Sequence, residues 1–312
     1  MMKHKFRLTR RRIIGIGCFG VAAVVIAGIY GYAPSMSGEP EVRPTVMRHS
    51  GAWPASERAG GERDLLKVIT LNVAHGSGNM RSPVLQKDET IMENLDKIAV
   101  VLRREGPAVT AIQEADGPSV WSGRVNQVSY LAEKGGFAYS VQAEHVKGMK
   151  ISYGTGLLSM PALREPLAIT FDASPPTLSK GFVVATFDWP GEPNVKINVV
   201  SVHLDFLRQS VREWQVAEMI DKLSSRGGEL IVMGDFNCEW KSKESAVRAI
   251  AEGLNLKAYQ PESAEMDTYP LLRMRMDWIL ISAGLEFVSY EVLSDAISDH
   301  YGVVCEVRRV GK

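Results

Sequence analysis

The chain has 312 residues, 45% hydrophobic and 23% charged, a composition that excludes a largely disordered protein. Basic and acidic residues are equal in number, 36 of each, but residues 1–50 carry a net charge of +6 and the remainder carries −6. Proteins that bind nucleic acid mainly through its phosphates are usually basic, so the acidic remainder disfavours that class. The three cysteines, Cys18, Cys238 and Cys305, indicate neither a disulfide scaffold nor a cysteine metal site, and the sequence leaves open whether Cys238 and Cys305 pair.

The N-terminus combines a basic segment, residues 1–12, with an uncharged apolar run over residues 13–33. About 20 apolar residues can cross a bilayer as a helix, and the basic flank of such a helix stays in the cytoplasm. The sequence therefore predicts a cytoplasmic tail, a membrane anchor over 13–33, and a single-pass inner- or plasma-membrane protein whose remaining chain is extracytoplasmic. A cleaved signal peptide, which would make the protein secreted, is the alternative; Pro34 directly after Ala33 disfavours cleavage there.

Residues 34–62 are rich in proline and glycine and are predicted to be a linker, which leaves one domain over residues 63–312. Within it, apolar residues spaced as on one helix face predict helices over 88–105, 208–225 and 244–252. Short β-branched runs predict strands over 66–71, 109–113, 154–159, 182–188, 195–203, 230–233, 276–282 and 302–307. Many strands with a few helices indicate two mixed sheets covered by helices, an α/β sandwich.

Six groups of polar residues stand at the ends of apolar runs, where strand ends would bring them to one edge of the domain. They are Asn72, Gln113-Glu114, His203, Gly234-Asp235-Phe236-Asn237, Asp277 and Ser298-Asp299-His300. Each group alone has an ordinary interpretation as a turn, a helix cap or a solvated carboxylate. Their occurrence together in one domain predicts an active site.

The ligand types in this set suit a hard divalent cation. Mg²⁺ takes carboxylate oxygens, and Glu114 and Asp299 supply them. Asn72 can help to hold the metal or a phosphate. The absence of a histidine and cysteine ligand set disfavours zinc. The sequence therefore predicts Mg²⁺ or Mn²⁺ as the cofactor.

The remaining polar residues suit hydrolysis of a phosphodiester by an activated water. His300 can accept the proton of the water, and Asp277 can hold the imidazole in the useful tautomer. Asp235 and Asn237 can orient the water and a phosphate oxygen. His203 can donate a hydrogen bond to the charge that builds on the phosphoryl oxygens.

The ordered set LN, QE, HL, GDFN, RMDW and SDH resembles the endonuclease/exonuclease/phosphatase superfamily over residues 66–307. The segments GTGLLSMP at 154–161 and TYP at 268–270 are similar to further motifs of that group. The resemblance implies a four-layered α/β sandwich, Mg²⁺ or Mn²⁺ dependence and phosphoester hydrolysis. It assigns Asn72 and Glu114 to the metal site. Ala74 departs from the abasic-site endonucleases, which carry a polar residue there, so the resemblance does not fix the substrate.

Three further residues are candidates for substrate contact: Arg212, Asp205 and Trp240. Arg212 could equally lie on a solvated helix face, and Trp240 could equally belong to the core. The predicted partner is a phosphodiester substrate, either a phospholipid headgroup, a nucleotide or nucleic acid, with membrane contact through the N-terminal helix and no obligate protein partner. The alternatives are a non-specific extracytoplasmic nuclease and a non-catalytic membrane scaffold. The scaffold is disfavoured because no residue of the predicted active site is missing.

Overall fold

The computed structural model describes residues 34–50, 64–79, 86–148 and 150–311. The predicted cytoplasmic tail and membrane anchor, residues 1–33, lie outside this part of the chain. A search of the described residues finds no helix with the length and apolar character needed to span a bilayer. Cys238 and Cys305, whose pairing the sequence left open, are both buried and not bonded to each other.

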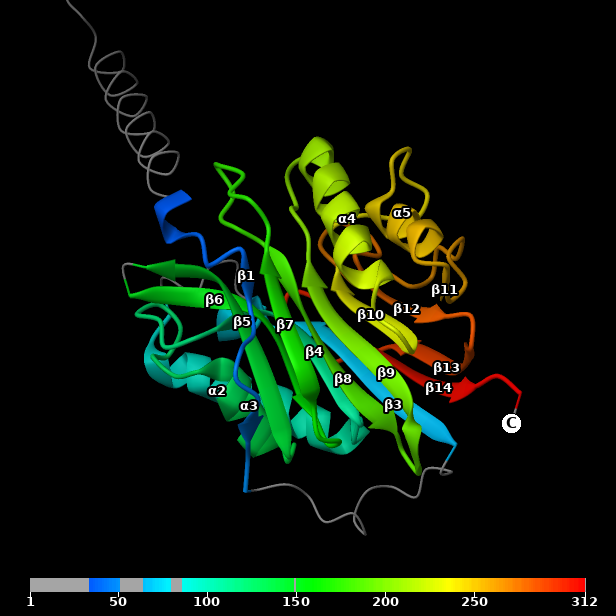
Figure 1. The fold of residues 1–312 in the computed structure, drawn as a ribbon. Helices are drawn as coiled ribbons and strands as arrows, with labels where there is room; N and C mark the ends of the chain where they lie inside the picture. The colour runs from blue at the N-terminus through cyan, green and yellow to red at the C-terminus, as the bar shows by residue number, and fades with distance from the viewer. Residues whose placement is uncertain (1–33, 51–63, 80–85, 149, 312) are drawn as a thin grey trace, which may run out of the picture.

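Two mixed β-sheets of seven strands each pack face to face (Figure 1). The first sheet has the order β13 (Leu285–Val292), β14 (Val303–Arg309), β3 (Leu65–Asn72), β4 (Val109–Asp116), β6 (Ile151–Ser159), β5 (Tyr139–Gly148), β2 (Met47–Arg48). The second sheet has the order β1 (Glu41–Val42), β7 (Arg164–Thr170), β8 (Gly181–Trp189), β9 (Glu192–His203), β10 (Glu229–Asp235), β12 (Asp277–Ser282), β11 (Leu256–Ala258). The predicted α/β sandwich is therefore confirmed.

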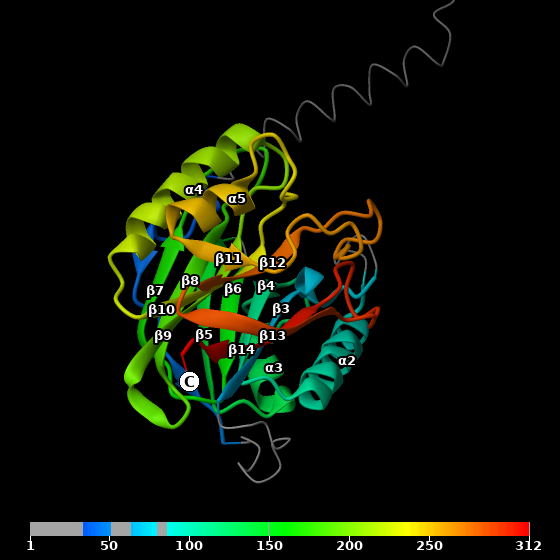
Figure 2. The same ribbon diagram turned by 90° about the vertical axis from the view of Figure 1, so that its right-hand side faces the viewer.

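Helices cover the outer face of each sheet, so the molecule has four layers (Figure 2). Helices α2 (Asp88–Glu105) and α3 (Gln127–Gly135) pack on the first sheet, and α4 (Gln209–Ser224) and α5 (Ala246–Gly253) pack on the second. Three apolar clusters result, one between the sheets and one under each helix pair. Sheets that are apolar on both faces need this double cover, because each face must be removed from water.

Helix α2 has the bounds that its sequence predicts. Ile91, Leu95, Ile98 and Leu102 are all buried against the first sheet. Gly106 ends the helix in the left-handed conformation, with φ 60°, which glycine adopts without steric cost. Asp88 is the first helical residue and makes no side-chain cap; its carboxylate lies at the positive end of the helix dipole and 3.3 Å from Nε of Arg124.

The segment predicted to be a linker differs from that prediction over its described part. Residues 34–36 form the 3₁₀ helix η1 (Pro34–Met36), β1 pairs with β7, and β2 pairs with β5. The N-terminal segment therefore extends both sheets at their edges. Edge pairing uses backbone hydrogen bonds and needs few apolar side chains, which explains why the composition did not reveal it.

The central strands bring their ends to one edge of the sandwich. Strands β3 and β4 are parallel, and so are β9 and β10, so all four of their carboxyl ends lie at that edge. Strand β12 runs antiparallel to β10 and begins there, with Asp277 opposite Asp235. Strand β14 runs antiparallel to β3 and also begins there, with Val303 opposite Thr70.

Gly234, next to the end of β10, has no room for a side chain. Its φ is +152°, and a Cβ at this position would lie 2.0 Å from the carbonyl oxygen of Val202 on β9. We expect Gly234→Ala to lower the free energy of unfolding by about 3 kcal/mol, because both strain and overlap with a neighbouring backbone oppose it. Gly191→Ala is the matched control: its φ is +83° and nothing lies within 4 Å, so about 1 kcal/mol of strain is expected. Urea unfolding measures the free energy of unfolding of both variants, and equal losses of stability would contradict the overlap at Gly234.

Candidate active site

The six predicted polar groups come together at the shared strand edge, around a cleft of about 290 Å³. Seven of the residues that line the cleft carry polar groups, and all but Tyr269 belong to the predicted groups: Glu114, His203, Asp235, Asn237, Tyr269, Asp299 and His300. The other lining residues are apolar: Phe206, Leu272 and Met276. The strand ends therefore lie around one cleft, and the roles of their residues remain predictions.

His300 and Asp277 form a buried, directed pair. Nδ1 of His300 lies 2.8 Å from Oδ2 of Asp277, and Asp277 is held in turn by its backbone N–H, which donates to Oγ1 of Thr268 at 3.0 Å. The second ring nitrogen, Nε2, lies 3.9 Å from Oδ2 of Asp235 and so faces the cleft. Burial disfavours the charged imidazole, but Asp277 and Asp235 raise the pKa of His300 to about 10.

Asp235 is held from two sides. Asn72 donates to its Oδ2 at 3.1 Å, and the backbone N–H of Asn237 donates to its Oδ1 at 2.9 Å. Asn237 has φ +49° and its amide donates to the carbonyl oxygen of Leu204, which fixes the loop after β10. Burial raises the pKa of Asp235 to about 7, although the charge of His300 opposes the rise.

Glu114 lies at a β-bulge that turns its side chain toward the cleft. The register between β4 and β6 shifts between Gln113 and Ala115, and Glu114 has φ +51°. Its Oε2 lies 3.3 Å from Nε2 of His75, and its Oε1 lies 3.8 Å from Nζ of Lys180. Burial opposes ionisation, but His75 and Lys180 hold the pKa of Glu114 well below its usual range.

His203, the last residue of β9, lies between two carboxylates and a lysine. Its Nε2 lies 3.6 Å from Oδ2 of Asp235 and 3.7 Å from Oε1 of Glu114. Nζ of Lys180 lies 3.2 Å from the same nitrogen. Burial and the charge of Lys180 lower the pKa of His203 well below its ordinary value. A neutral imidazole at this position keeps one N–H that can donate to a substrate oxygen.

Sequence reasoning missed a second histidine–aspartate pair behind Glu114. Nδ1 of His75 lies 2.6 Å from Oδ1 of Asp116, whose other oxygen accepts from Trp121 Nε1 at 2.6 Å and from the Ser122 hydroxyl. Burial opposes protonation, but Glu114 and Asp116 raise the pKa of His75. The only sequence signal was His75-Gly76 just after Asn72. Lys180 gave no signal, because it belongs to no motif.

The donor set around the cleft fits a divalent cation. Glu114 and Asp299 both line the cleft, and burial together with the charge of Glu114 raises the pKa of Asp299. Two carboxylates that repel each other across a cleft are a favourable place for a hard cation. Asp235, Asp277 and His300 also have ligand atoms within 4.8 Å of one another. Nδ1 of His300 is already bonded to Asp277, so this second group fits an oriented imidazole better than a metal site.

The structure does not bring Asn72 into the lining of the cleft. Its amide N–H₂ donates to Asp235 and its Oδ1 accepts from the N–H of Ala74 at 3.0 Å. These contacts place Asn72 behind Asp235, and its metal contact remains a prediction.

Asp205, Arg212 and Trp240, the predicted substrate contacts, also lie away from the cleft lining. Asp205 is fully buried and accepts from the backbone N–H groups of Leu207 and Arg208. Trp240 packs beside Trp278, with ring centroids 6.1 Å apart.

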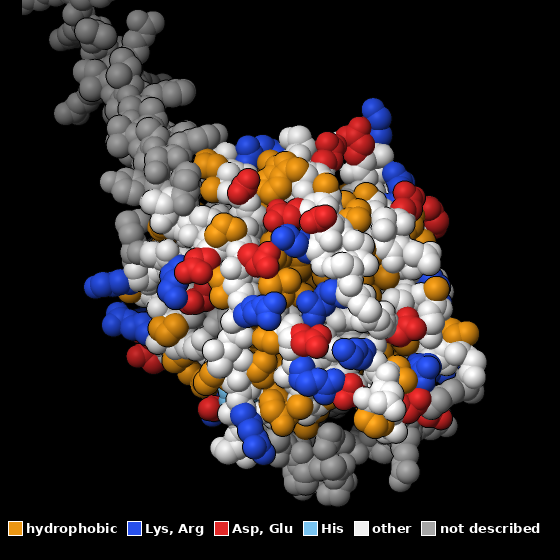
Figure 3. Space-filling view, in the orientation of Figure 1, with side chains coloured by type: hydrophobic (Ala, Val, Ile, Leu, Met, Phe, Trp, Pro, Cys, Tyr) orange, Lys and Arg blue, Asp and Glu red, His pale blue; other side chains and the backbone are white. Residues whose placement is uncertain are grey.

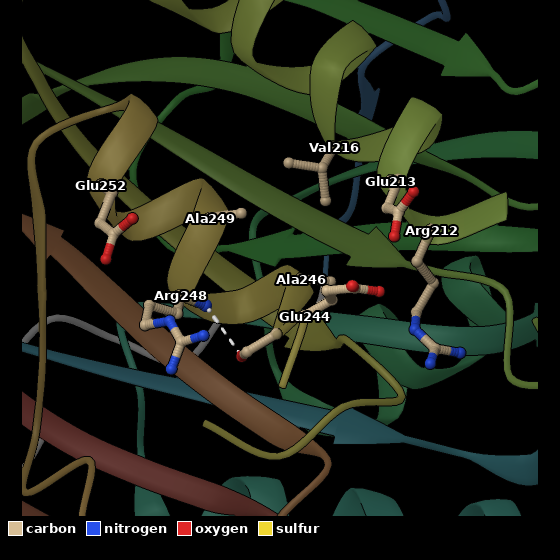
Figure 4. Close-up of a pocket in the computed structure, with 9 residues that line it drawn as sticks. Arg212, Glu213, Val216, Glu244, Ala246, Arg248, Ala249 and Glu252 are labelled. Carbon is tan, nitrogen blue, oxygen red and sulfur yellow. Dashed lines mark hydrogen bonds between the residues drawn. The ribbon is translucent and has the colours of Figure 1, made fainter. Parts of the chain in front are cut away.

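Arg212 lines a different cavity, of about 320 Å³, between α4 and α5. Figure 4 shows Arg212 on α4 and Arg248 on α5 at opposite sides of this cavity. The Arg212 guanidinium donates to the carbonyl oxygen of Asp205 at 2.9 Å. Arg212 therefore braces the loop after β9.

Fold and cleft together define the class: an α/β sandwich with carboxylates and histidines gathered at one sheet edge, as in phosphoester hydrolases. A model of the endonuclease/exonuclease/phosphatase family matches residues 69–300. The chain belongs to this family, whose members are hydrolases that act on phosphoester bonds.

Solved structures share the fold at low sequence identity. An endonuclease/exonuclease/phosphatase from Beutenbergia cavernae is 19% identical, with a TM-score of 0.63 over 79% of this chain and 72% of that chain. The mannosyl-6-phosphatase of Bacteroides thetaiotaomicron is 15% identical, with a TM-score of 0.58 over 78% of this chain and 99% of that chain. Truncated TDP2 of Caenorhabditis elegans is 16% identical, with a TM-score of 0.54 over 78% of this chain and 97% of that chain. No curated protein matched the sequence.

Proposed function

We propose that this protein is a divalent-metal-dependent phosphodiesterase in which His300 activates the attacking water. One observation carries the proposal. The imidazole that Asp277 orients faces Asp235 in the same cleft that Glu114 and Asp299 line. An oriented base opposite a pair of carboxylate ligands is the arrangement that metal-assisted hydrolysis requires.

Each side chain has a distinct part in the proposed reaction. Nε2 of His300 accepts the proton of the water, while Asp277 keeps the proton of Nδ1 in place and stabilises the imidazolium that forms. Asp235 and Asn237 orient the water and one phosphate oxygen. Neutral His203 donates to the charge that builds on phosphorus-bound oxygens.

Glu114 and Asp299 would hold Mg²⁺ or Mn²⁺ in this proposal. The cation would neutralise phosphate charge and would lower the pKa of His300 from about 10 toward neutrality. Without the cation, Asp277 and Asp235 favour the protonated imidazole of His300, and the protonated form cannot accept a proton from water. The base role and the metal requirement therefore depend on each other.

The cleft favours a diester over a monoester. A diester carries one negative charge at neutral pH and a monoester carries up to two, and the cationic His75 and Lys180 are already engaged with Glu114. The apolar lining residues Phe206, Leu272 and Met276 offer contacts to a second ester group. On the face seen in Figure 3, basic and acidic side chains are interspersed.

Two chromogenic esters test the proposal. With Mg²⁺, we expect the full-length protein to hydrolyse bis(p-nitrophenyl) phosphate with a kcat/KM at least about tenfold above that for p-nitrophenyl phosphate, which corresponds to about 1.4 kcal/mol. The control is the same pair of assays with His300→Gln. A preference for the monoester would contradict the proposal and would indicate a phosphomonoesterase instead.

A further inference from the structure

Exposed apolar side chains gather at the mouth of the cleft. Of the nine large hydrophobic side chains that are exposed in the described residues, four form two adjacent pairs there: Phe206 (59% exposed), Leu207 (52%), Leu271 (57%) and Leu272 (59%). Phe206 and Leu272 line the cleft itself. We call these four residues the apolar rim. Monomeric proteins rarely place large apolar side chains together in water unless they contact a partner.

The first pair is held outward by a fixed loop. Asp205, fully buried, accepts from the backbone N–H groups of Leu207 and Arg208 at 2.9 and 2.7 Å. Its other oxygen accepts from the hydroxyl groups of Ser174 and Thr177. The hydrogen bonds of buried Asp205 therefore fix the loop in a conformation that exposes Phe206 and Leu207.

The second pair occupies the tip of a tight turn before β12. Tyr269 and Met274 form a β-bridge across the turn, and the N–H of Leu272 donates to the carbonyl oxygen of Tyr269 at 3.3 Å. Arg273, at the same tip, adopts φ +52°. The turn therefore directs Leu271 and Leu272 into solvent, and Leu272 lines the cleft as Phe206 does.

We propose that the apolar rim inserts into a zwitterionic phospholipid bilayer and that the substrate is a phospholipid of that bilayer, whose phosphodiester enters the cleft. This inference rests on the proposed phosphodiesterase function. Apolar side chains at the mouth of a polar cleft match a molecule that joins a phosphodiester to acyl chains. The rim is continuous with the cleft through Phe206 and Leu272, so one substrate can contact both.

Charge and chain position favour this partner over others. The chain after residue 50 carries a net charge of −6, which repels nucleic acids and anionic lipid surfaces. The N-terminal segment runs close to the same edge, because Ser179 donates to the hydroxyl of Ser37 at 2.8 Å and the next residue, Lys180, contacts His203. An anchor over residues 13–33, as the sequence predicts, would thus tether the cleft end of the domain.

The test compares substrates with and without acyl chains, using the full-length protein and Mg²⁺. The lipid substrate is vesicles of equal parts phosphatidylcholine, phosphatidylethanolamine and sphingomyelin, and the chain-free substrate is glycerophosphocholine at the same phosphate concentration. We expect the vesicles to be hydrolysed at least about tenfold faster. The double variant Leu207→Ser, Leu271→Ser should lose about 100-fold on vesicles, since each leucine loses its burial in lipid. The matched control is Val288→Ser, Val310→Ser, whose valines are also exposed but lie in β13 and directly after β14 and not in the apolar rim; it should retain the wild-type rate.

Three outcomes overturn the inference. They are equal rates on glycerophosphocholine and vesicles, a wild-type vesicle rate in the Leu207→Ser, Leu271→Ser variant, and cleavage of plasmid DNA in preference to vesicles. Bis(p-nitrophenyl) phosphate separates the two proposals. If it is hydrolysed but the vesicles are not, the apolar rim has another role while the phosphodiesterase function stands. If no diester is hydrolysed, the phosphodiesterase function itself is wrong.

Discussion

Replacing His300 by glutamine is expected to lower the kcat for bis(p-nitrophenyl) phosphate by about 10³-fold, within the range that general acid–base catalysis contributes. Glutamine is preferred over alanine because it keeps a polar side chain of similar size beside Asp277, which His300 contacts at 2.8 Å, but cannot act as a base at neutral pH. Alanine would remove the partner of a buried carboxylate and would cost stability as well as activity. The variant therefore separates loss of the base from loss of the fold.

The matched control for this experiment is His49→Gln. His49 is also buried and contacts the hydroxyl of Ser140 at 2.8 Å, but it does not line the cleft. Its replacement should leave kcat within about twofold. A His300→Gln enzyme that keeps more than about a tenth of wild-type turnover would show that another group activates the water.

Replacing Asp235 by asparagine is expected to lower kcat by about 10²-fold or more and, in the metal-free protein, to raise stability at alkaline pH. Asp235 lies 3.6 Å from His203 and 3.9 Å from His300, so it can orient groups between them. Asparagine keeps the shape and removes the charge. At alkaline pH the folded wild type must bury the ionised carboxylate of Asp235, which costs stability. The variant has no charge at this position and avoids that cost.

The sign of the pH effect follows from the pKa of Asp235, which folding raises from 3.8 to about 7. Between these values the folded state binds more protons than the unfolded state, so stability falls as pH rises. The free energy of unfolding falls by about 1.4 kcal/mol per pH unit in this range, and the Asp235→Asn variant lacks this dependence. Urea unfolding in EDTA at pH 5 and pH 8 should therefore show that the stability of the variant relative to the wild type is higher at pH 8 than at pH 5. An equal difference at both pH values would mean that Asp235 is not buried as an acid.

Much of the fold was predictable from the sequence, because apolar periodicity marks the helices and strands and polar residues mark the strand ends. The helix over 88–105 and the strands that end at Asn72, His203 and Asp235 are examples. Strands β1, β2, β5, β7, β11 and β13 and helix α3 were not predicted. Strand β13 is only partly buried, and α3 has only nine residues. Such segments are stabilised by pairing and packing with distant parts of the chain, which local pattern does not encode.

The site was predictable to the extent that its residues stand at strand ends. Convergence of Glu114, Asp235 and His300 follows from the parallel strands and their antiparallel neighbours. Lys180 and Asp116 could not be predicted, since their contacts cross between elements far apart in sequence. The sequence also did not distinguish residues in the cleft from residues that brace it, and Asp205 and Arg212 belong to the second kind.

Metal dependence tests the central claim most directly. After EDTA treatment, the full-length protein should lose hydrolysis of bis(p-nitrophenyl) phosphate, and Mg²⁺ or Mn²⁺ should restore it. Calorimetric titration with Mn²⁺ should show an affinity that Glu114→Gln weakens by more than about tenfold, whereas Glu244→Gln, in the cavity between α4 and α5, leaves it unchanged. Full turnover in EDTA, rescue by zinc alone, or equal Mn²⁺ affinity in wild type and Glu114→Gln would contradict a hard-cation phosphodiesterase.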